Sequence, residues 1–103
     1  MFNLVFYVPL THAEKVKEAV FQAGAGRLGD YDQCCWEVKG QGQFRALKGA
    51  TPYVGQVNKL EKVEELKVEL LCQEEAVESV IQALKGAHPY QTPAYFLLKA
   101  VDF

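Results

Sequence analysis

Two short stretches hold most of the residues whose side chains could do chemistry. The first, residues 24–38, reads GAGRLGDYDQCCWEV and combines a glycine-rich turn with an arginine, acidic residues, adjacent cysteines and the only tryptophan. The second, residues 88–95, reads HPYQTPAY. We take the following as candidate ligand-binding residues, most of them from these stretches: Arg27, Asp30, Tyr31, Cys34, Cys35, Glu37, Arg45, His88 and Tyr90.

The adjacent thiols of Cys34 and Cys35 are one candidate. Three cysteines make an odd count, which predicts reduced thiols. If Cys34 lies inside with Trp36 on a strand, Cys35 faces outward. Arg27 nearby would ease ionisation of such a thiol, so that it reacts or binds a soft metal. The alternative is plain packing, and no nearby histidine supports a cysteine hydrolase.

His88 and Tyr90 form a second candidate group. Either His88 is a metal ligand or proton donor with Tyr90 as its hydrogen-bonding partner, or His88 caps the carbonyls of a preceding helix in a rigid turn. His88, Cys35 and Glu37 are the candidate metal ligands. No ligand-spacing motif supports a divalent metal, so the cofactor stays open, and we name no catalytic residue.

The glycine-rich segment 24–29 matches the pattern GxGxxG. It follows a predicted helix instead of opening one, which excludes a dinucleotide-binding fingerprint. The loop could still bind a small anion through backbone N–H groups and the Arg27 guanidinium. Alternatively, the glycines simply permit a tight crossover.

Length and composition indicate one globular domain, residues 1–103, with half of the residues apolar. The formal net charge of −2 gives no basic footprint for nucleic acid or an anionic membrane. No segment approaches the roughly 20 apolar residues that span a bilayer, and no signal peptide is visible. We therefore predict a cytoplasmic domain with neither a nucleic-acid nor a membrane partner.

Hydrophobic periodicity predicts two helices and five strand segments. Thr11 and Glu14 suggest a capping box at the first helix, Gly24 its end, and Gly86 the end of the second helix. Residues 40–42 suggest a tight hairpin turn. In chain order we expect a central strand at 2–8, a helix at 11–23, hairpin strands at 33–39 and 44–47, a strand at 66–70, a helix at 73–84 and a strand at 94–101.

The order β-α-β-β-α-β predicts a ferredoxin-like α+β fold, an antiparallel four-stranded sheet with two helices on one face. The other sheet face is then uncovered. We expect it to carry residues from the first and last strands: Val5 and Tyr7, with either Phe96 and Leu98 or Leu97 and Val101. An uncovered apolar face marks a subunit interface, so we predict self-association.

Four segments together resemble one known family: GAGRLGDYDQCCW, GQGQFRALKGATPYVGQV, KLEKVEELKVELL and ALKGAHPYQTPAYFLL. They are similar to the CutA-like insert domain of the YqfO family, the NGG-interacting-factor-three superfamily, and the chain resembles that insert standing alone. The resemblance implies a CutA/PII-like fold and a homo-oligomer, with a trimer favoured. The family's dimetal ligands lie in another domain and do not transfer. Members commonly read HPYEEPAY, whereas this chain has Gln91 and Thr92 in place of the acidic pair.

These observations predict a non-enzymatic, self-associating CutA-like domain with a regulatory small-ligand or metal-binding role and a small molecule or protein as partner. The alternatives are a purely structural interaction module and an enzyme with a thiol or histidine nucleophile. We also predict that residues 24–37 and 88–95 lie side by side, because both follow a helix and enter a strand.

Overall fold

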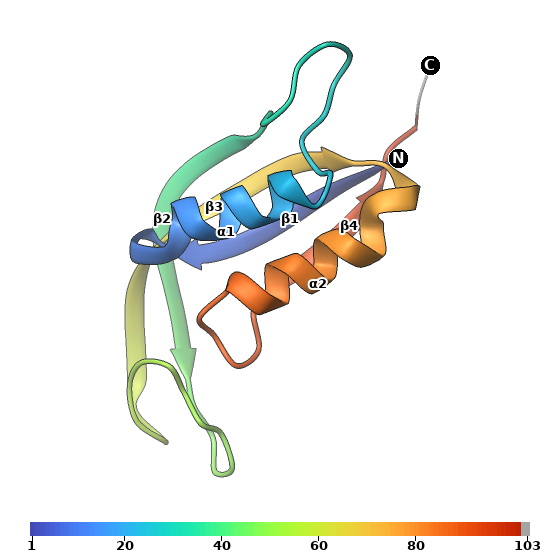
Figure 1. Ribbon diagram of the computed structural model, residues 1–103. Helices are drawn as coiled ribbons and strands as arrows, with labels where there is room; N and C mark the ends of the chain where they lie inside the picture. The colour runs from blue at the N-terminus through green and yellow to red at the C-terminus, as the bar shows by residue number, and fades with distance from the viewer. Residues whose placement is uncertain (102–103) are drawn as a thin grey trace.

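The most apolar strand lies at the centre of the sheet. The structure, a computed structural model, describes residues 1–101 and shows a four-stranded antiparallel sheet with both helices on one face (Figure 1). The strand order is β2-β3-β1-β4, so the predicted ferredoxin-like α+β fold is confirmed. The elements are β1 (Phe2–Pro9), α1 (Ala13–Gln22), β2 (Trp36–Arg45), β3 (Leu60–Cys72), α2 (Val77–Ala87) and β4 (Tyr95–Lys99), with short 3-10 turns at Leu10–His12 and Glu74–Ala76.

Strand β1 pairs with β3 on one side and β4 on the other, as its two apolar faces predict. Leu4, Phe6 and Val8 face the helices and are completely buried. Val5 is also buried, at 1% exposure, but it lies outside the cluster beneath the helices. Burial of each large apolar side chain contributes about 1.5–3 kcal/mol, so β1 is the chief support of the fold.

The helices bury the residues that their spacing predicts. Val16 and Val20 of α1, and Val80 and Leu84 of α2, are completely buried against the sheet. Each pair is four residues apart, which places both side chains on one helix face. No helix within residues 1–101 is long and apolar enough to cross a lipid bilayer.

The helix ends differ in part from the predictions. Gly24 follows α1 with a φ of 114°, so its stop role is confirmed. The capping box is wrong: Thr11 lies in the 3-10 turn after β1, and its hydroxyl contacts His12 Nδ1 at 2.9 Å. Gly86 lies inside α2, which ends at Ala87. His88 has an extended backbone there because it precedes Pro89. A residue that precedes proline is disfavoured in the helical region of the backbone dihedral angles.

The predicted hairpin turn at residues 40–42 is wrong. Strand β2 runs straight through Gly40 and Gly42 and pairs with β3 over ten residues, from Trp36↔Glu69 to Arg45↔Leu60. Neither glycine is among the residues with positive φ. Residues 46–59 form the connection, so β3 begins earlier than predicted. Neither glycine turns the chain, and only Gly42 is closely approached by another side chain, that of Glu65.

The uncovered sheet face carries more apolar surface than expected. The register aligns Val5 with Phe96 on β4 and with Glu69 on β3, and Glu69 pairs with Trp36. Phe96 and Leu98 therefore share this face, and Leu97 packs on the helix side. Trp36, expected in the core, is 61% exposed. The next residue, Glu37, faces α1, so alternation turns Trp36 to the open face.

Candidate functional site

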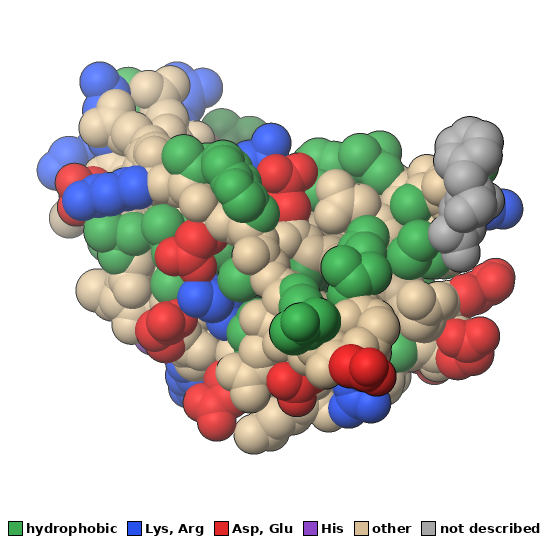
Figure 2. All heavy atoms as spheres, turned by 90° about the horizontal axis from the view of Figure 1, so that it is seen from above, with side chains coloured by type: hydrophobic (Ala, Val, Ile, Leu, Met, Phe, Trp, Pro, Cys, Tyr) green, Lys and Arg blue, Asp and Glu red, His purple; other side chains and the backbone are tan. Residues whose placement is uncertain are grey.

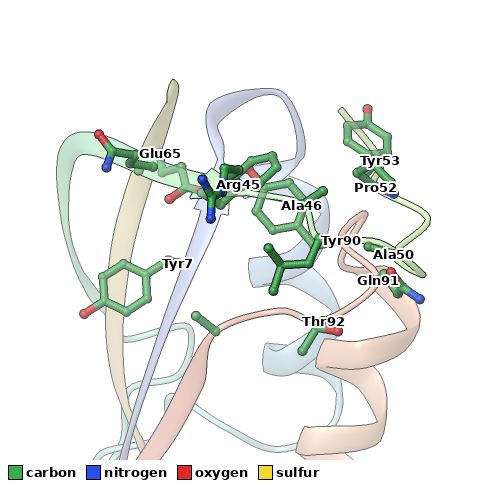
Figure 3. A pocket seen from close by; sticks show the side chains of 15 residues that line it. Tyr7, Arg45, Ala46, Ala50, Pro52, Tyr53, Glu65, Tyr90, Gln91 and Thr92 are labelled. Carbon is green, nitrogen blue, oxygen red and sulfur yellow. Dashed lines mark hydrogen bonds between the residues drawn. The ribbon is translucent and has the colours of Figure 1, made fainter. Parts of the chain in front are cut away.

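A pocket of about 520 Å³ lies between two loops, residues 46–59 and residues 88–94, at one end of the sheet (Figure 3). We call it the two-loop pocket. Its volume is in the range of small-molecule sites. Its lining combines aromatic and aliphatic side chains with a few polar groups. Among the residues that line it are Tyr7, Gly42, Phe44, Arg45, Tyr53, Glu65, Tyr90 and Gln91.

His88 fixes the position of this pocket on the sheet. Its ring is buried, and Nε2 lies 2.7 Å from the Tyr7 carbonyl oxygen on β1. Nδ1 accepts a hydrogen bond of 3.1 Å from the Tyr90 backbone N–H. Nε2 must then carry the proton, which defines a neutral tautomer. Burial lowers the pKa of His88, although the bond to Tyr7 opposes this shift. The neutral imidazole of His88, hydrogen-bonded through both ring nitrogens, holds Tyr90 in place.

Tyr90 is held at its other end by Glu65. Its hydroxyl donates a 2.7 Å hydrogen bond to Glu65 Oε2 on β3. Burial raises the pKa of the Tyr90 phenol, and the hydrogen bond to the Glu65 carboxylate raises it further. The phenol therefore stays protonated and donating at neutral pH. Tyr90 bridges the loop of residues 88–94 to the middle of the sheet.

Gly42 makes room for this bridge. A methyl group at position 42 would overlap the Glu65 carboxyl group, whereas one at Gly40 would meet nothing within 4 Å. The Glu65 side chain lies across the bare backbone of β2 on its way to Tyr90. The structure thus gives Gly42 a role in the site and leaves Gly40 without one.

The two loops are also bonded to each other. The Thr51 backbone N–H donates a 3.0 Å hydrogen bond to Gln91 Oε1. Phe44 and Tyr53 flank Tyr90, with ring centroids 6.0 and 6.3 Å from its own. Figure 3 shows side chains from β1, β2 and both loops around the same cavity. Together with Glu65 of β3, the pocket is therefore assembled from three strands and two loops.

Of the predicted site residues, His88, Tyr90 and Arg45 belong to this region. Arg45 and Tyr90 line the pocket, and His88 lies under Tyr90 with ring centroids 5.0 Å apart. His88 does cap a carbonyl at the end of α2, as one of the two readings expected, but it does so through its backbone. Its backbone N–H bonds to the Leu84 carbonyl, while the ring turns to β1.

The stretch around residues 24–35 lies at the opposite end of the sheet (Figure 1). The Gly26 N–H donates to the Leu71 carbonyl at 2.8 Å, level with Asn3 on β1, whereas His88 bonds to Tyr7. Four residues of strand separate those levels, about 13 Å. The predicted side-by-side arrangement is therefore wrong.

In the view from above, hydrophobic side chains reach the surface among charged ones (Figure 2).

The glycines of this segment allow close packing rather than anion binding. Gly26 has a φ of 78°, and a Cβ there would lie 2.8 Å from the Cys34 carbonyl oxygen. The backbone N–H groups of residues 24, 25, 26 and 28 all donate to carbonyls of the protein. These four donors are therefore already used and are not free to hold an anion beside Arg27. Asp30 and Tyr31 lie exposed at the loop tip.

Cys35 and Glu37 meet around Lys17. Glu37 bonds to Lys17 Nζ at 2.7 Å, and Glu14 bonds to it at 2.9 Å. Burial alone would lower the pKa of Lys17, but these carboxylates raise it well above its ordinary value. Cys35 packs on the core side, not outward as expected, and burial raises the pKa of its thiol. The thiol is therefore protonated, contrary to the expected activation.

The candidate metal ligands are not assembled into a site. Within residues 1–101, no three His, Cys, Asp or Glu side chains are placed to hold a metal ion. Cys35 and Glu37 lie near Lys17, whose ammonium group already neutralises Glu37. Cys34 is only half buried, and its thiol points to the Asp32 carbonyl at 3.6 Å.

Several pocket residues were not predicted from the sequence. Glu65 stands among charged residues that alternate with apolar ones, a pattern typical of a solvent-exposed strand face, and Gly42 lies in the predicted turn. The available signal was the alternation of side chains along β3. It places Glu65 on the open face of the sheet, opposite Gly40. Phe44 and Tyr53 are aromatic residues close to a glycine- and proline-containing loop, which is also typical of a pocket wall.

No known family profile matches this chain. Individual relatives do match. The chain is 45% identical over 97 residues to the "GTP cyclohydrolase 1 type 2 homolog" proteins of Mycobacterium leprae and Mycobacterium tuberculosis, a match that covers 94% of this chain and 25% and 26% of theirs. The Bacillus subtilis protein of the same name is 39% identical over 93 residues, covering 90% of this chain and 25% of that protein.

Solved structures agree with these relatives. A Bacillus cereus protein related to NIF3 superposes with a TM-score of 0.80 and 36% identity over 93% of this chain and 24% of that one. CutA1 from Pyrococcus horikoshii superposes with a TM-score of 0.70 and 20% identity over 100% of this chain and 86% of that one. The chain is a CutA-like domain of the YqfO family.

This CutA-like domain spans about a quarter of the length of its curated relatives. The PII-like protein CutA from Nostoc sp. PCC 7120 also superposes, with a TM-score of 0.68 and 15% identity over 97% of this chain and 81% of that one. At such identities the CutA likeness shows the fold alone.

Proposed function

We propose that this CutA-like domain is a non-enzymatic, self-associating module that binds a small ligand in a regulatory role. The observation that carries the proposal is the uncovered sheet face. Trp36, Val38, Phe96 and Leu98 lie on it with 42% to 61% of their surface exposed. Leaving such a face in water forfeits about 25 cal/mol per Å² of apolar surface. A second copy of the chain would cover it.

We favour a trimer, as the CutA-like resemblance implies. The outer edge of the sheet supports association as well. Strand β2 is a ten-residue edge strand whose side chains are almost all exposed. An unpaired edge of this length offers backbone N–H and C=O groups to another strand. Both the face and the edge of the sheet are therefore available to neighbouring copies.

Native mass spectrometry of the purified domain tests the association. We expect one oligomeric species, a trimer, at about 10 µM, with any co-purifying ligand or metal visible as added mass. Leu98→Glu should give monomer, because it places a charge in the apolar interface. Gln82→Glu adds a similar charge to the exposed side of α2 and should leave the oligomer intact. A monomeric wild-type domain would contradict the proposal.

The two-loop pocket supports the ligand-binding part of the proposal. A purely structural module needs no enclosed space, and here about 520 Å³ is surrounded by hydrogen-bonded loops. The thiol or histidine enzyme receives little support, because burial raises the pKa of Cys35 and both ring nitrogens of His88 are engaged. We therefore propose no catalytic residue.

The relatives' name refers to GTP cyclohydrolase, but about three quarters of their length lies outside the match. We assign no such activity to this domain. A small molecule or a protein remains the proposed partner. We also propose a cytoplasmic location, which the three free thiols of Cys34, Cys35 and Cys72 support, because reduced cysteines are typical of that compartment.

A further inference from the structure

We propose that the two-loop pocket binds a small flat molecule, an aromatic or heteroaromatic ring that carries N–H donors. The donors bond to the Glu65 carboxylate, and the ring lies among Phe44, Tyr53 and Tyr90. This inference rests on the proposed ligand-binding role, for which it names a site and a class of ligand.

The first reason is the Glu65 carboxylate, which forms no ion pair within 4 Å among residues 1–101, although Arg45 lines the same pocket. Glu65 is half buried and lines the pocket, and one of its oxygens accepts the Tyr90 hydroxyl. In the described part of the chain, the ion pairs within 4 Å involve other carboxylates, those of Glu14, Glu37 and Glu64. A carboxylate offers about four acceptor positions, so Glu65 can take further donors. Cationic N–H groups make the strongest of these bonds.

The second reason is the aromatic wall. The Tyr90 ring is tilted by 60° to Phe44 and by 51° to Tyr53, at centroid distances of 6.0 and 6.3 Å. Tyr53 is 55% exposed and can move aside, whereas Tyr90 is held at both ends. Aromatic walls favour flat rings through stacked or edge-to-face contacts, and a positive charge near them adds a cation–π attraction. A flat donor-bearing ring satisfies the wall and the carboxylate together.

The third reason is that the pocket is fixed before a ligand arrives. His88 ties Tyr90 to β1, and Gln91 ties its loop to Thr51. Side chains already held by such bonds lose little further freedom on binding, so even a small ligand can bind measurably. The Glu65–Tyr90 bond sets the distance between the carboxylate and the ring wall. The site is therefore selective for the shape and the donors of its ligand.

Titration of the 15N-labelled domain with benzamidine tests the inference. Benzamidine is a flat ring with cationic N–H donors, and benzoate has the same ring with an acidic group instead. We expect benzamidine to shift the backbone amides of Gly42, Glu65 and Tyr90, and benzoate to bind at least tenfold more weakly. Glu65→Gln keeps the shape of the side chain but removes its charge, and it should weaken benzamidine binding at least tenfold. The matched control is Glu64→Gln, which alters only an exposed ion pair with Lys39 and should change affinity less than twofold.

The inference would be overturned by equal binding of benzoate and benzamidine, by equal effects of the two variants, or by no shift at millimolar benzamidine. Shifts confined to residues around Lys17 and Arg27 would also overturn it, but they would leave the proposed ligand-binding role standing. Self-association is read independently from the rotational correlation time of the same samples. Loss of the oligomer would therefore count against the proposed function and not against the pocket.

Discussion

Replacing Gly42 by alanine should separate the pocket's hydrogen bonds from the stability of the strand itself. Glycine inside a strand costs about 0.5–1 kcal/mol relative to alanine, so both Gly40→Ala and Gly42→Ala gain about that amount from the backbone. At position 40 the methyl group meets nothing within 4 Å, and the gain remains. At position 42 it displaces the Glu65 carboxyl group and breaks the bond to Tyr90.

The size of that loss follows from the bond. A hydrogen bond to a charged group contributes about 1.5–3 kcal/mol. Because Glu65 and Tyr90 are only half buried, hydrogen bonds to water replace part of this contribution. We therefore expect the free energy of unfolding to decrease by about 1–2 kcal/mol. Gly42→Ala should therefore unfold about 1–2 kcal/mol more easily than Gly40→Ala. For a domain of this size, each kcal/mol corresponds to roughly 4–8 °C of melting temperature.

Urea unfolding of the two variants measures this difference. A second readout is the ionisation of Tyr90, followed by NMR of 13Cζ-labelled tyrosine during an alkaline titration. Wild type and Gly40→Ala should keep the raised pKa of Tyr90, and in Gly42→Ala it should move back toward its ordinary value, because the Glu65 bond is gone. Equal stability of the two variants, together with an unchanged Tyr90 titration in Gly42→Ala, would refute the assigned role of Gly42.

Two further predictions concern groups whose pKa is shifted by burial. Burial lowers the pKa of His88 in the folded state. Below about pH 6.5 the unfolded chain therefore binds more protons than the folded chain, and the free energy of unfolding should decrease as the pH is lowered. Urea unfolding between about pH 5 and 7.5 should show a smaller decrease in the free energy of unfolding toward low pH for His88→Gln than for the control His12→Gln. Equal slopes in the two variants would argue against a role of His88 in this pH dependence. Burial raises the pKa of the Cys35 thiol, so its alkylation by iodoacetamide at neutral pH should be several-fold slower than that of glutathione and should accelerate toward pH 9. Peptide mass spectrometry measures both rates, and a Cys35 as reactive as glutathione would contradict this assignment.

Much of the fold was predictable because it depends on local patterns. The four-residue spacing of Val16–Val20 and Val80–Leu84 reflects the helical period of 3.6, and the unbroken apolar run of β1 is typical of a strand buried on both faces. The element order then leaves few arrangements, and the ferredoxin-like sheet is one of them. The uncovered face followed from the same arrangement, because both helices lie on one face of the sheet and leave the other without a covering layer.

Local rules failed where a residue serves a distant partner. Gly42 has the sequence context of a turn, yet its neighbour in space is Glu65, which reaches Tyr90 from another strand. His88 has the context of a helix cap or a ligand, but the decisive contact is the Tyr7 carbonyl, 81 residues away in the chain. No pattern within a short window can report such contacts.

The sequence by itself determined the order of helices and strands, the core residues of β1 and of the two helices, and that one sheet face is left open, because these follow from hydrophobic periodicity. Only the tertiary structure decided which functional residues meet. It separated residues 24–35 from His88 by four residues of β1 and brought Glu65, Tyr90 and Gly42 together from two strands and a loop. Strand register and sheet twist set those meetings, and both depend on the whole chain.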